Sequence, residues 1–205
     1  MTTRIKGLTG ATLETVPSVC HGCVWWQSRS GRGVDKRRWI RGTEDEWGAW
    51  GTVYYDDDER VLGSMQFGPS GLFPRAAELP AGPPSDDAVL VTCAYLTDPS
   101  KPWVMQSLFL TAIGEARERG ARALEAFAYR YADSDSSLER FHVHKTIFPS
   151  DFLADFGFTT VRAHGRVELA RLELGGLQPV VEGTREKVLR VVRDAFVPAP
   201  APQRP

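Results

Sequence analysis

The sequence has few cysteines, no excess of positive charge and no long apolar run. There are three cysteines in 205 residues, and this small, odd number does not suit a disulfide framework. Lys+Arg 25 against Asp+Glu 26 leaves a formal charge of -1, whereas a nucleic-acid-binding protein usually has a basic excess. No stretch is long and apolar enough for a membrane span or a signal peptide. These absences predict a soluble cytoplasmic protein that binds neither nucleic acid nor membrane.

One long stretch of the sequence, between Gly82 and Gly114, contains no glycine. Elsewhere the 19 glycines and 14 prolines indicate many turns between short elements. A chain that is 42% apolar and 25% charged has an ordinary globular composition. We therefore expect one domain over residues 1–196 and a Pro-rich, disordered tail over residues 197–205.

Hydrophobic patterning predicts alternating strands and helices after an N-terminal region of one or two short helices. The nearly uninterrupted apolar run at 88–96 is typical of a central strand buried on both faces. Apolar residues at i, i+3 and i+4 spacing, with Ser100 as the cap and Gly120 after the end, predict the longest helix. The other predicted elements are hairpin strands at 49–55 and 60–67, strands at 123–130 and 166–174, and helices at 148–156 and 184–196.

Two irregular features interrupt this pattern. Residues 68–87 contain five prolines and three glycines, which is typical of a long functional or mobile loop. In strand 166–174 the alternating apolar positions slip by one residue between Leu169 and Leu172, which predicts a β-bulge or a change of partner. The strand–helix–strand order in the middle of the chain implies a parallel pair, so the predicted fold class is α/β with a mixed sheet.

Four segments add a family resemblance to this order of elements. They are CHGCVWWQ at residues 20–27, SDDAVL at 85–90, GARALEAF at 120–127 and FPSDFLADFGF at 148–158. Over residues 3–175 the chain resembles the GCN5-related N-acetyltransferase (GNAT) family. The resemblance implies a mixed, mostly antiparallel sheet with a central parallel strand pair, flanked by helices. It also implies an N-acyltransferase that moves an acetyl or other acyl group from acyl-CoA to a small-molecule or protein amine, without a metal.

The resemblance places acyl-CoA beside the central strand. In that family the strand backbone pairs with the pantetheine arm, and a strand N–H polarises the thioester carbonyl. The pyrophosphate lies on exposed N–H groups at the start of the long helix. The cofactor-binding positions implied here are Cys93, Ala94, Tyr95 and Leu96 on the strand, and Lys101, Trp103, Val104, Met105, Gln106 and Ser107 at the helix.

The phosphate loop departs from the family pattern Arg/Gln-x-x-Gly-x-Gly/Ala. The matching window is SKPWVM at residues 100–105, where Trp103 and Met105 occupy the two glycine positions. Glycine allows close approach of the backbone to a ligand, and Pro102 has no N–H to donate. This degenerate loop leaves two hypotheses open: an acyltransferase in which Lys101 attracts phosphate, or a non-catalytic protein that binds another small ligand or a protein partner.

Three residues are candidates for proton transfer in the implied reaction. Alternation places Glu125 and Tyr129 on one face of strand 123–130, where Glu125 would act as base and Tyr129 as acid. Asp87, at the start of the central strand, is a second candidate for the base. The alternatives are a structural carboxylate paired with arginine for Glu125, and a loop-end cap or solvated carboxylate for Asp87.

The remaining polar clusters have simpler interpretations. Cys20 and Cys23 have zinc-ligand spacing, but one such pair is a weak signal, and nothing in the sequence links it to His142 and His144, so no metal is expected. The basic run at 29–41 favours a solvated helix face. The predicted last helix would pack on its own domain or on a second copy in a homodimer.

Overall fold

An eight-stranded mixed sheet organises the part of the chain that the computed structural model describes, which is residues 4–29, 33–98, 100–132 and 147–175. Its strand order is β1-β2-β3-β4-β5-β8-β7, and β6 pairs with β5 beside this path. Within these residues only β4–β5 and β5–β6 are parallel. The predicted fold class is confirmed. The strands are β1 Ile5–Gly7, β2 Gly51–Tyr55, β3 Val61–Pro69, β4 Ala88–Leu96, β5 Ala123–Tyr129, β6 Phe148–Pro149, β7 Thr159–His164 and β8 Val167–Glu173.

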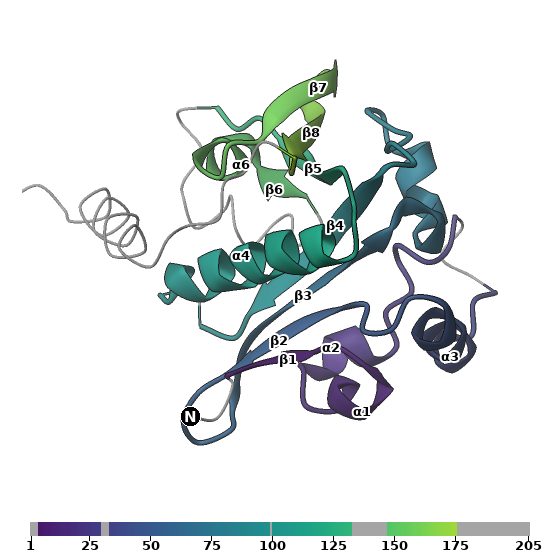
Figure 1. Cartoon of the computed structure of the whole chain (residues 1–205), viewed down its shortest axis with the longest axis vertical. Coiled ribbons are helices and arrows are strands. Elements are labelled where there is room, and N and C mark those ends of the chain that lie inside the picture. Colours follow the sequence, from purple (N-terminus) through teal and green to yellow (C-terminus); the bar gives the residue numbers. More distant parts are fainter. Residues whose placement is uncertain (1–3, 30–32, 99, 133–146, 176–205) are drawn as a thin grey trace, which may run out of the picture. The chain divides into compact units, whose positions relative to one another are not determined.

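Helices flank this sheet, as predicted. Figure 1 shows α4 lying across β3 and β4, whereas α1 and α2 lie beside β1 and β2. No helix within the described ranges is long and apolar enough to cross a membrane. The helices are α1 Gly10–Leu13, α2 Ser18–His21, α3 Lys36–Glu46, α4 Pro102–Glu118 and α6 Ser150–Asp155, with short 3-10 helices η1 Ser70–Leu72 and η2 Pro74–Glu78.

The chain divides into two units, Met1–Gly175 and Gly176–Pro205. Everything described here belongs to the first unit. The helix predicted at 184–196 and the tail predicted at 197–205 lie outside the described residues.

Most predicted elements are present, but three details differ. The strands β1, β6 and β7 were not predicted, because β1 has three residues, β6 has two and β7 is exposed along its length. β6 occupies the start of the helix predicted at 148–156, which begins only at Ser150. Lys101, not Ser100, is the N-cap of α4, since the Ser100 hydroxyl donates to Asp98 Oδ1 at 2.6 Å. The slip in strand 166–174 is not a bulge of β8, which pairs regularly with β5. The register shift is in its other partner, β7.

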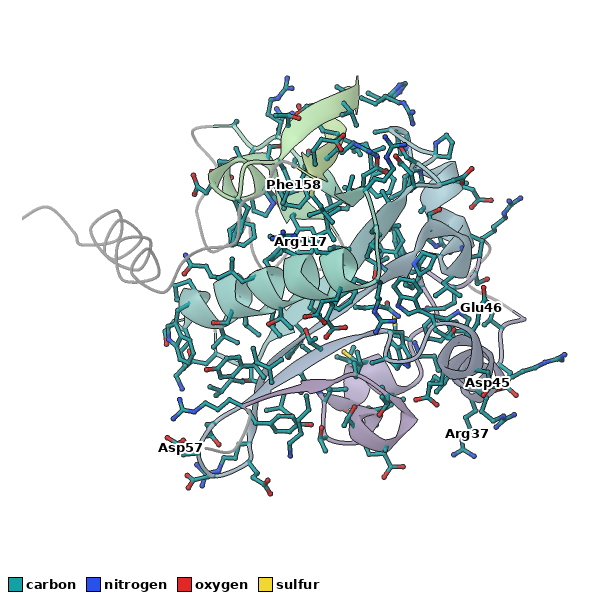
Figure 2. The ribbon with its side chains drawn as sticks, in the orientation of Figure 1. Arg37, Asp45, Glu46, Asp57, Arg117 and Phe158 are labelled. Atoms are coloured by element: carbon teal, nitrogen blue, oxygen red, sulfur yellow. The ribbon has the colours of Figure 1, made fainter. Side chains whose placement is uncertain are left out.

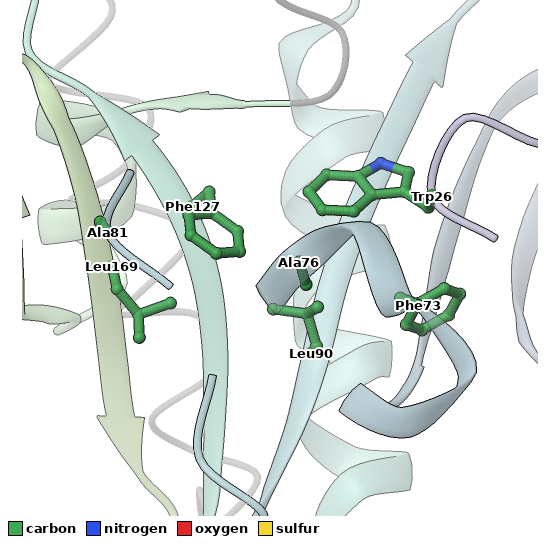
Figure 3. Packing of buried hydrophobic residues seen from close by; sticks show 7 residues of the cluster. All are labelled: Trp26, Phe73, Ala76, Ala81, Leu90, Phe127 and Leu169. Atoms are coloured by element: carbon green, nitrogen blue, oxygen red, sulfur yellow. The ribbon is translucent and has the colours of Figure 1, made fainter. Parts of the chain in front are cut away.

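The core on one side of the sheet is an aromatic and aliphatic cluster. Figure 3 shows Leu90 of β4, Phe127 of β5 and Leu169 of β8 meeting Ala76 of η2 and the indole of Trp26. The Trp26 and Phe127 rings are stacked with centroids 6.0 Å apart. The segment before α3 is therefore fixed against the middle of the sheet.

The other side of β5 is covered by α4. Leu108, Phe109 and Ala112 are fully buried on this helix, at the spacing that predicted it. The ring of Phe109 lies 5.0 Å from that of Phe148 and 5.2 Å from that of Phe156. These contacts hold β6 and α6 against α4.

Leu90→Ala should reduce the free energy of unfolding by about 2–5 kcal/mol, because it removes a fully buried side chain and leaves a cavity. Leu110→Ala on α4 is the matched control, since Leu110 is 57% exposed and its loss should cost less than about 0.5 kcal/mol. Urea unfolding measures both. Equal losses for the two variants would contradict the described core.

Candidate functional site

The parallel pair at the centre of the sheet separates after four residue pairs. β4 and β5 are paired from Ala88↔Ala123 to Val91↔Ala126. Beyond this point β5 continues beside β8 and gains β6, whereas residues 92–96 of β4 pair, among the described residues, with β3 alone. One edge of β4 therefore presents backbone N–H and C=O groups that no described strand uses.

A β-bulge lies at the point where β4 leaves β5. Phe67 of β3 faces Val91, but the next residue, Gln66, faces Cys93, so Thr92 is an extra residue in β4. A bulge redirects the side chains that follow it. Cys93 consequently packs against the same cluster as Leu90, and the residues after the bulge line a cavity.

This cavity has a volume of about 210 Å³ and lies between the N-terminal helices and strands β3 and β4. Val19 in its lining is 64% exposed and marks an apolar rim. The strand residues that line the cavity are Ser64, Gln66, Cys93, Ala94 and Tyr95, and the others are Leu8, Leu13, Val16, Val19, Cys20, Cys23, Trp26, Gln27, Lys36 and Trp50. Three of the four predicted pantetheine-binding positions of the central strand are thus brought together at one cavity.

Lys36 is the only formally charged residue in this lining as described. It begins α3 and shares the inward face with Ile40 and Thr43, which are buried. Asp35 caps the helix by accepting from the N–H groups of Arg37 and Arg38. Burial lowers the pKa of the Lys36 ammonium, because desolvation disfavours the charged form.

The other basic residues of this run that the structure describes are exposed, as predicted. Arg37, Arg38 and Arg41 are exposed, and Figure 2 shows Arg37, Asp45 and Glu46 projecting outward from α3. The prediction was incomplete for Lys36 alone, because a lysine at the first turn of an exposed helix gives no sign in the sequence that it turns inward.

The N-terminus of α4 offers few donors to a pyrophosphate. Pro102 has no N–H, and the Val104 N–H already donates to the Lys101 carbonyl at 3.1 Å. The Lys101 ammonium lies 3.7 Å from the Asp98 carboxylate. The donors that a glycine-rich loop would supply are therefore reduced here, although a basic side chain is present.

The two residues that replace glycine differ in environment. Trp103 is 43% exposed and its ring lies edge-on to Tyr54, with centroids 5.4 Å apart. Met105 is buried, as is Val104, whereas Gln106 and Ser107 are partly exposed. Trp103 is thus an anchor between α4 and β2, and Met105 belongs to the core.

Glu125 and Asp87 meet on one arginine. Both terminal nitrogens of Arg171 contact the Asp87 carboxylate, at 2.9 and 3.0 Å, and Arg171 Nη1 donates to Glu125 Oε1 at 3.1 Å. Glu125 is fully buried and also accepts from the backbone N–H and the hydroxyl of Ser85. These contacts favour the interpretation of Glu125 as a structural carboxylate, which the sequence left open.

The hydrogen bonds from Arg171 also lower the pKa of the Asp87 carboxyl, which weakens it as a base. Neither Asp87 nor Glu125 lines the cavity, and nor does Tyr129. Tyr129 is partly buried at the end of β5, beyond the separation of β4 and β5, and its ring lies 4.9 Å from that of Tyr131.

The three cysteines of the chain all line the cavity. Burial raises the pKa of the Cys93 thiol to about 12, so it is a neutral, unreactive group. Within the described residues no group of three or more His, Cys, Asp or Glu side chains is arranged to hold a metal ion. His142 and His144 lie outside the described residues.

No protein-family model and no curated protein matches this sequence, but solved structures are similar to it. PaiA N-acetyltransferase of Thermoplasma acidophilum in complex with coenzyme A is 13% identical, with 84% of this chain and 99% of that chain covered and a TM-score of 0.46. An N-acetyltransferase of Staphylococcus aureus Mu50 is 15% identical, with 83% and 97% covered and a TM-score of 0.49. Both neighbours are acetyltransferases.

A third neighbour, a GNAT family acetyltransferase of Brucella melitensis in complex with acetyl-CoA, is 14% identical, with 85% and 90% covered and a TM-score of 0.40. The Brucella melitensis protein thus bears the name of the family that the sequence motifs resemble. At these identities and TM-scores the likeness assigns no function to this chain.

Arg171→Met should reduce the free energy of unfolding by about 3–5 kcal/mol, because it leaves the buried Glu125 carboxylate without its counter-charge. The double variant Glu125→Leu/Arg171→Met should regain most of this loss, since it removes the buried charge as well. Chemical denaturation of both variants measures the difference. A double variant less stable than the single one would contradict the pairing.

Asp87 should make stability depend on pH in one direction. Its folded-state pKa is lowered from 3.8 by Arg171, so its contribution is complete above that ordinary pKa and is lost as the pH falls through the folded-state pKa. The stability advantage of the wild type over Asp87→Asn should therefore shrink on acidification. Urea unfolding of both proteins at successively lower pH checks this, and an advantage that grows would refute it.

Proposed function

We propose that this protein is an N-acyltransferase that uses acyl-CoA and an amine. The amine nitrogen attacks the thioester carbon, a C–N bond forms, and the C–S bond breaks. The amine loses a proton, and the departing CoA thiolate gains one. In this scheme acyl-CoA is a co-substrate, and the protein supplies position, desolvation and hydrogen-bond donors.

The observation that carries this proposal is that the edge of β4 with which no described strand pairs lies at the cavity. The edge over residues 92–96 offers backbone groups to a pantetheine amide, as an added strand would use them. Cys93, Ala94 and Tyr95 lie on this edge and also line the cavity. A thioester placed there would have its acyl carbon beside a space for the acceptor.

The apolar cavity also bears on how the amine is deprotonated. None of its described lining residues is an aspartate, glutamate or histidine, so the described part of the wall offers neither a carboxylate nor an imidazole as a base. Desolvation lowers the pKa of an ammonium group, as it does for Lys36 in the same wall. The same desolvation would lower the pKa of the acceptor ammonium and so favour loss of its proton before the attack.

Among the predicted catalytic residues we assign proton donation to Tyr129. Tyr129 lies at the end of β5, beyond the point where β5 separates from β4. In the proposed scheme the CoA thiolate leaves beside residues 92–96 of β4. We assign Glu125 and Asp87 to positioning, because both carboxylates already accept hydrogen bonds within the protein. Arg171 donates to both of them, and Ser85 donates to Glu125. Through this cluster they hold β8 and the start of β4 to β5.

A second candidate function is non-catalytic binding of a small ligand in the same cavity. Trp103 and Pro102 at the start of α4 favour it, because they remove the close approach and one of the donors that a CoA pyrophosphate normally uses. Under this hypothesis a small ligand binds in the cavity, but acyl-CoA does not bind to the protein.

Titration calorimetry with acetyl-CoA separates the two. The acyltransferase proposal expects binding in the micromolar range, and about tenfold tighter binding by Trp103→Gly, because the indole no longer covers the approach to the helix N-terminus. Leu110→Gly on the same helix is the control for the cost of a helical glycine. Binding by Trp103→Gly but not by the wild type would support the non-catalytic alternative.

A further inference from the structure

The cavity beside β4 presents an almost entirely apolar surface. Four of its polar lining residues meet it through their apolar atoms, because their side-chain nitrogens have essentially no accessible surface. These nitrogens are Trp26 Nε1, Gln27 Nε2, Trp50 Nε1 and Gln66 Nε2. The Gln66 Oε1 atom already accepts from the Thr92 hydroxyl at 3.2 Å and from the Cys93 thiol at 3.5 Å. A polar or charged group inside the cavity would therefore lose hydrogen bonds to water without replacing them, which is costly.

Lys36 makes the cavity wall unfavourable for a second positive charge. Its Nζ lies 5.0 Å from the ring centroid of Trp50, and Trp50 lines the cavity, so the ammonium adjoins the wall. The described lining contains no aspartate or glutamate to offset this charge. Like charges repel strongly where little water lies between them. A ligand that carried an ammonium group into the cavity would meet both this repulsion and the cost of desolvation.

The cavity has room for one ring or a chain of a few carbons. An apolar cavity of about 150 Å³ holds a benzene-sized molecule, and this one has a volume of about 210 Å³. The rim residue Val19 is 64% exposed, so the entrance is apolar as well. Cys93, Ala94 and Tyr95 join the cavity to the edge of β4 with which no described strand pairs. An apolar group in the cavity would thus lie next to a group bound at that edge.

We infer that the acceptor substrate is a monoamine whose remainder is an uncharged apolar group that occupies the cavity. This inference rests on the proposed function, which places the thioester at residues 92–96 of β4. The amine nitrogen would approach the acyl carbon from the cavity. An acyl chain long enough to fill the cavity would take the space that the nitrogen needs, so the apolar group belongs to the acceptor. Diamines and longer polyamines are excluded, because they carry a second ammonium group.

The apolar cavity is tested without CoA, by calorimetric titration with benzene. The wild type should bind benzene, and Cys20→Phe should bind it at least about tenfold more weakly, because the new ring fills space that a dry apolar cavity offers to a ligand. Cys20 lines the cavity, whereas Ser18, on the same helix α2, is exposed and outside the described lining, so Ser18→Phe is the matched control. No binding by the wild type, or equal binding by the two variants, would overturn the inference.

The exclusion of a second charge is tested with pentylamine and cadaverine, which has the same chain with an amine at both ends. With acetyl-CoA as donor, kcat/KM should be at least about tenfold higher for pentylamine, because its chain has no charged end to desolvate. Lys36→Met should reduce this ratio by removing the repulsion, and Arg37→Met, on the exposed side of α3, should keep it. An undiminished ratio in Lys36→Met would overturn the role of Lys36.

The length of the apolar group is tested in the wild type, so this test stands even if Cys20→Phe fails to fold. From ethylamine to pentylamine, kcat/KM with acetyl-CoA should rise about two- to fourfold for each methylene, since each one leaves water for an apolar site. A flat series would overturn the inference. If activity rose instead from acetyl-CoA to hexanoyl-CoA with one short amine, the cavity would hold the acyl chain.

These experiments separate the substrate class from the proposed function. Acetyl transfer to amines with equal use of pentylamine and cadaverine would refute the substrate class and leave the proposed function standing. Benzene binding without transfer from acetyl-CoA to any of these amines would refute the proposed enzymatic function and the acceptor class together. Transfer that favours pentylamine, in a protein whose cavity binds benzene, supports the whole inference.

Discussion

The parallel hydrogen bonding of β4 to β5 stops after Val91 and Ala126, and the candidate site depends on this limit. If the ladder continued, β5 would pair with residues 92–96 of β4 and cover the edge that no other described strand uses. The bulge at Thr92 then turns Cys93 toward the cavity and brings two donors to Gln66. A short change in strand register thus creates an edge of β4 that no described strand pairs with and brings residues of this edge to the cavity.

Charge is arranged differently in two regions of the domain. Arg171 gathers Asp87 and Glu125 into a cluster whose carboxylates are satisfied within the protein. Lys36 has aromatic rings around it and no carboxylate from the described residues. The first arrangement stabilises the junction of β4, β5 and β8, whereas the second leaves an ammonium between indole rings without a carboxylate partner among the described residues. The carboxylates of Asp87 and Glu125 are therefore structural, whereas the ammonium of Lys36 lines the cavity.

The sequence predicted the elements with strong periodicity. β4, α4 and β5 follow from continuous or regularly spaced apolar residues, and the parallel pair follows from their order. β7 escaped prediction because it is exposed at every position and so lacks an alternating pattern. The role of Glu125 depends on its contact with Arg171. The two residues are far apart in the sequence, so local patterns could not predict this contact. Lys36 and Gln66 were missed because burial of a single polar side chain depends on tertiary packing and leaves no local signal.

The central claim is that the edge of β4 over residues 92–96 and the adjoining cavity hold an acyl thioester. A crystal structure of the protein with acetyl-CoA tests this most directly. The account predicts that the pantetheine amides pair with the backbone of residues 92–96 and that the acetyl group lies at the cavity mouth beside Cys93, Ala94 and Tyr95. Acetyl-CoA bound elsewhere, with the β4 edge and the cavity unchanged, would contradict it.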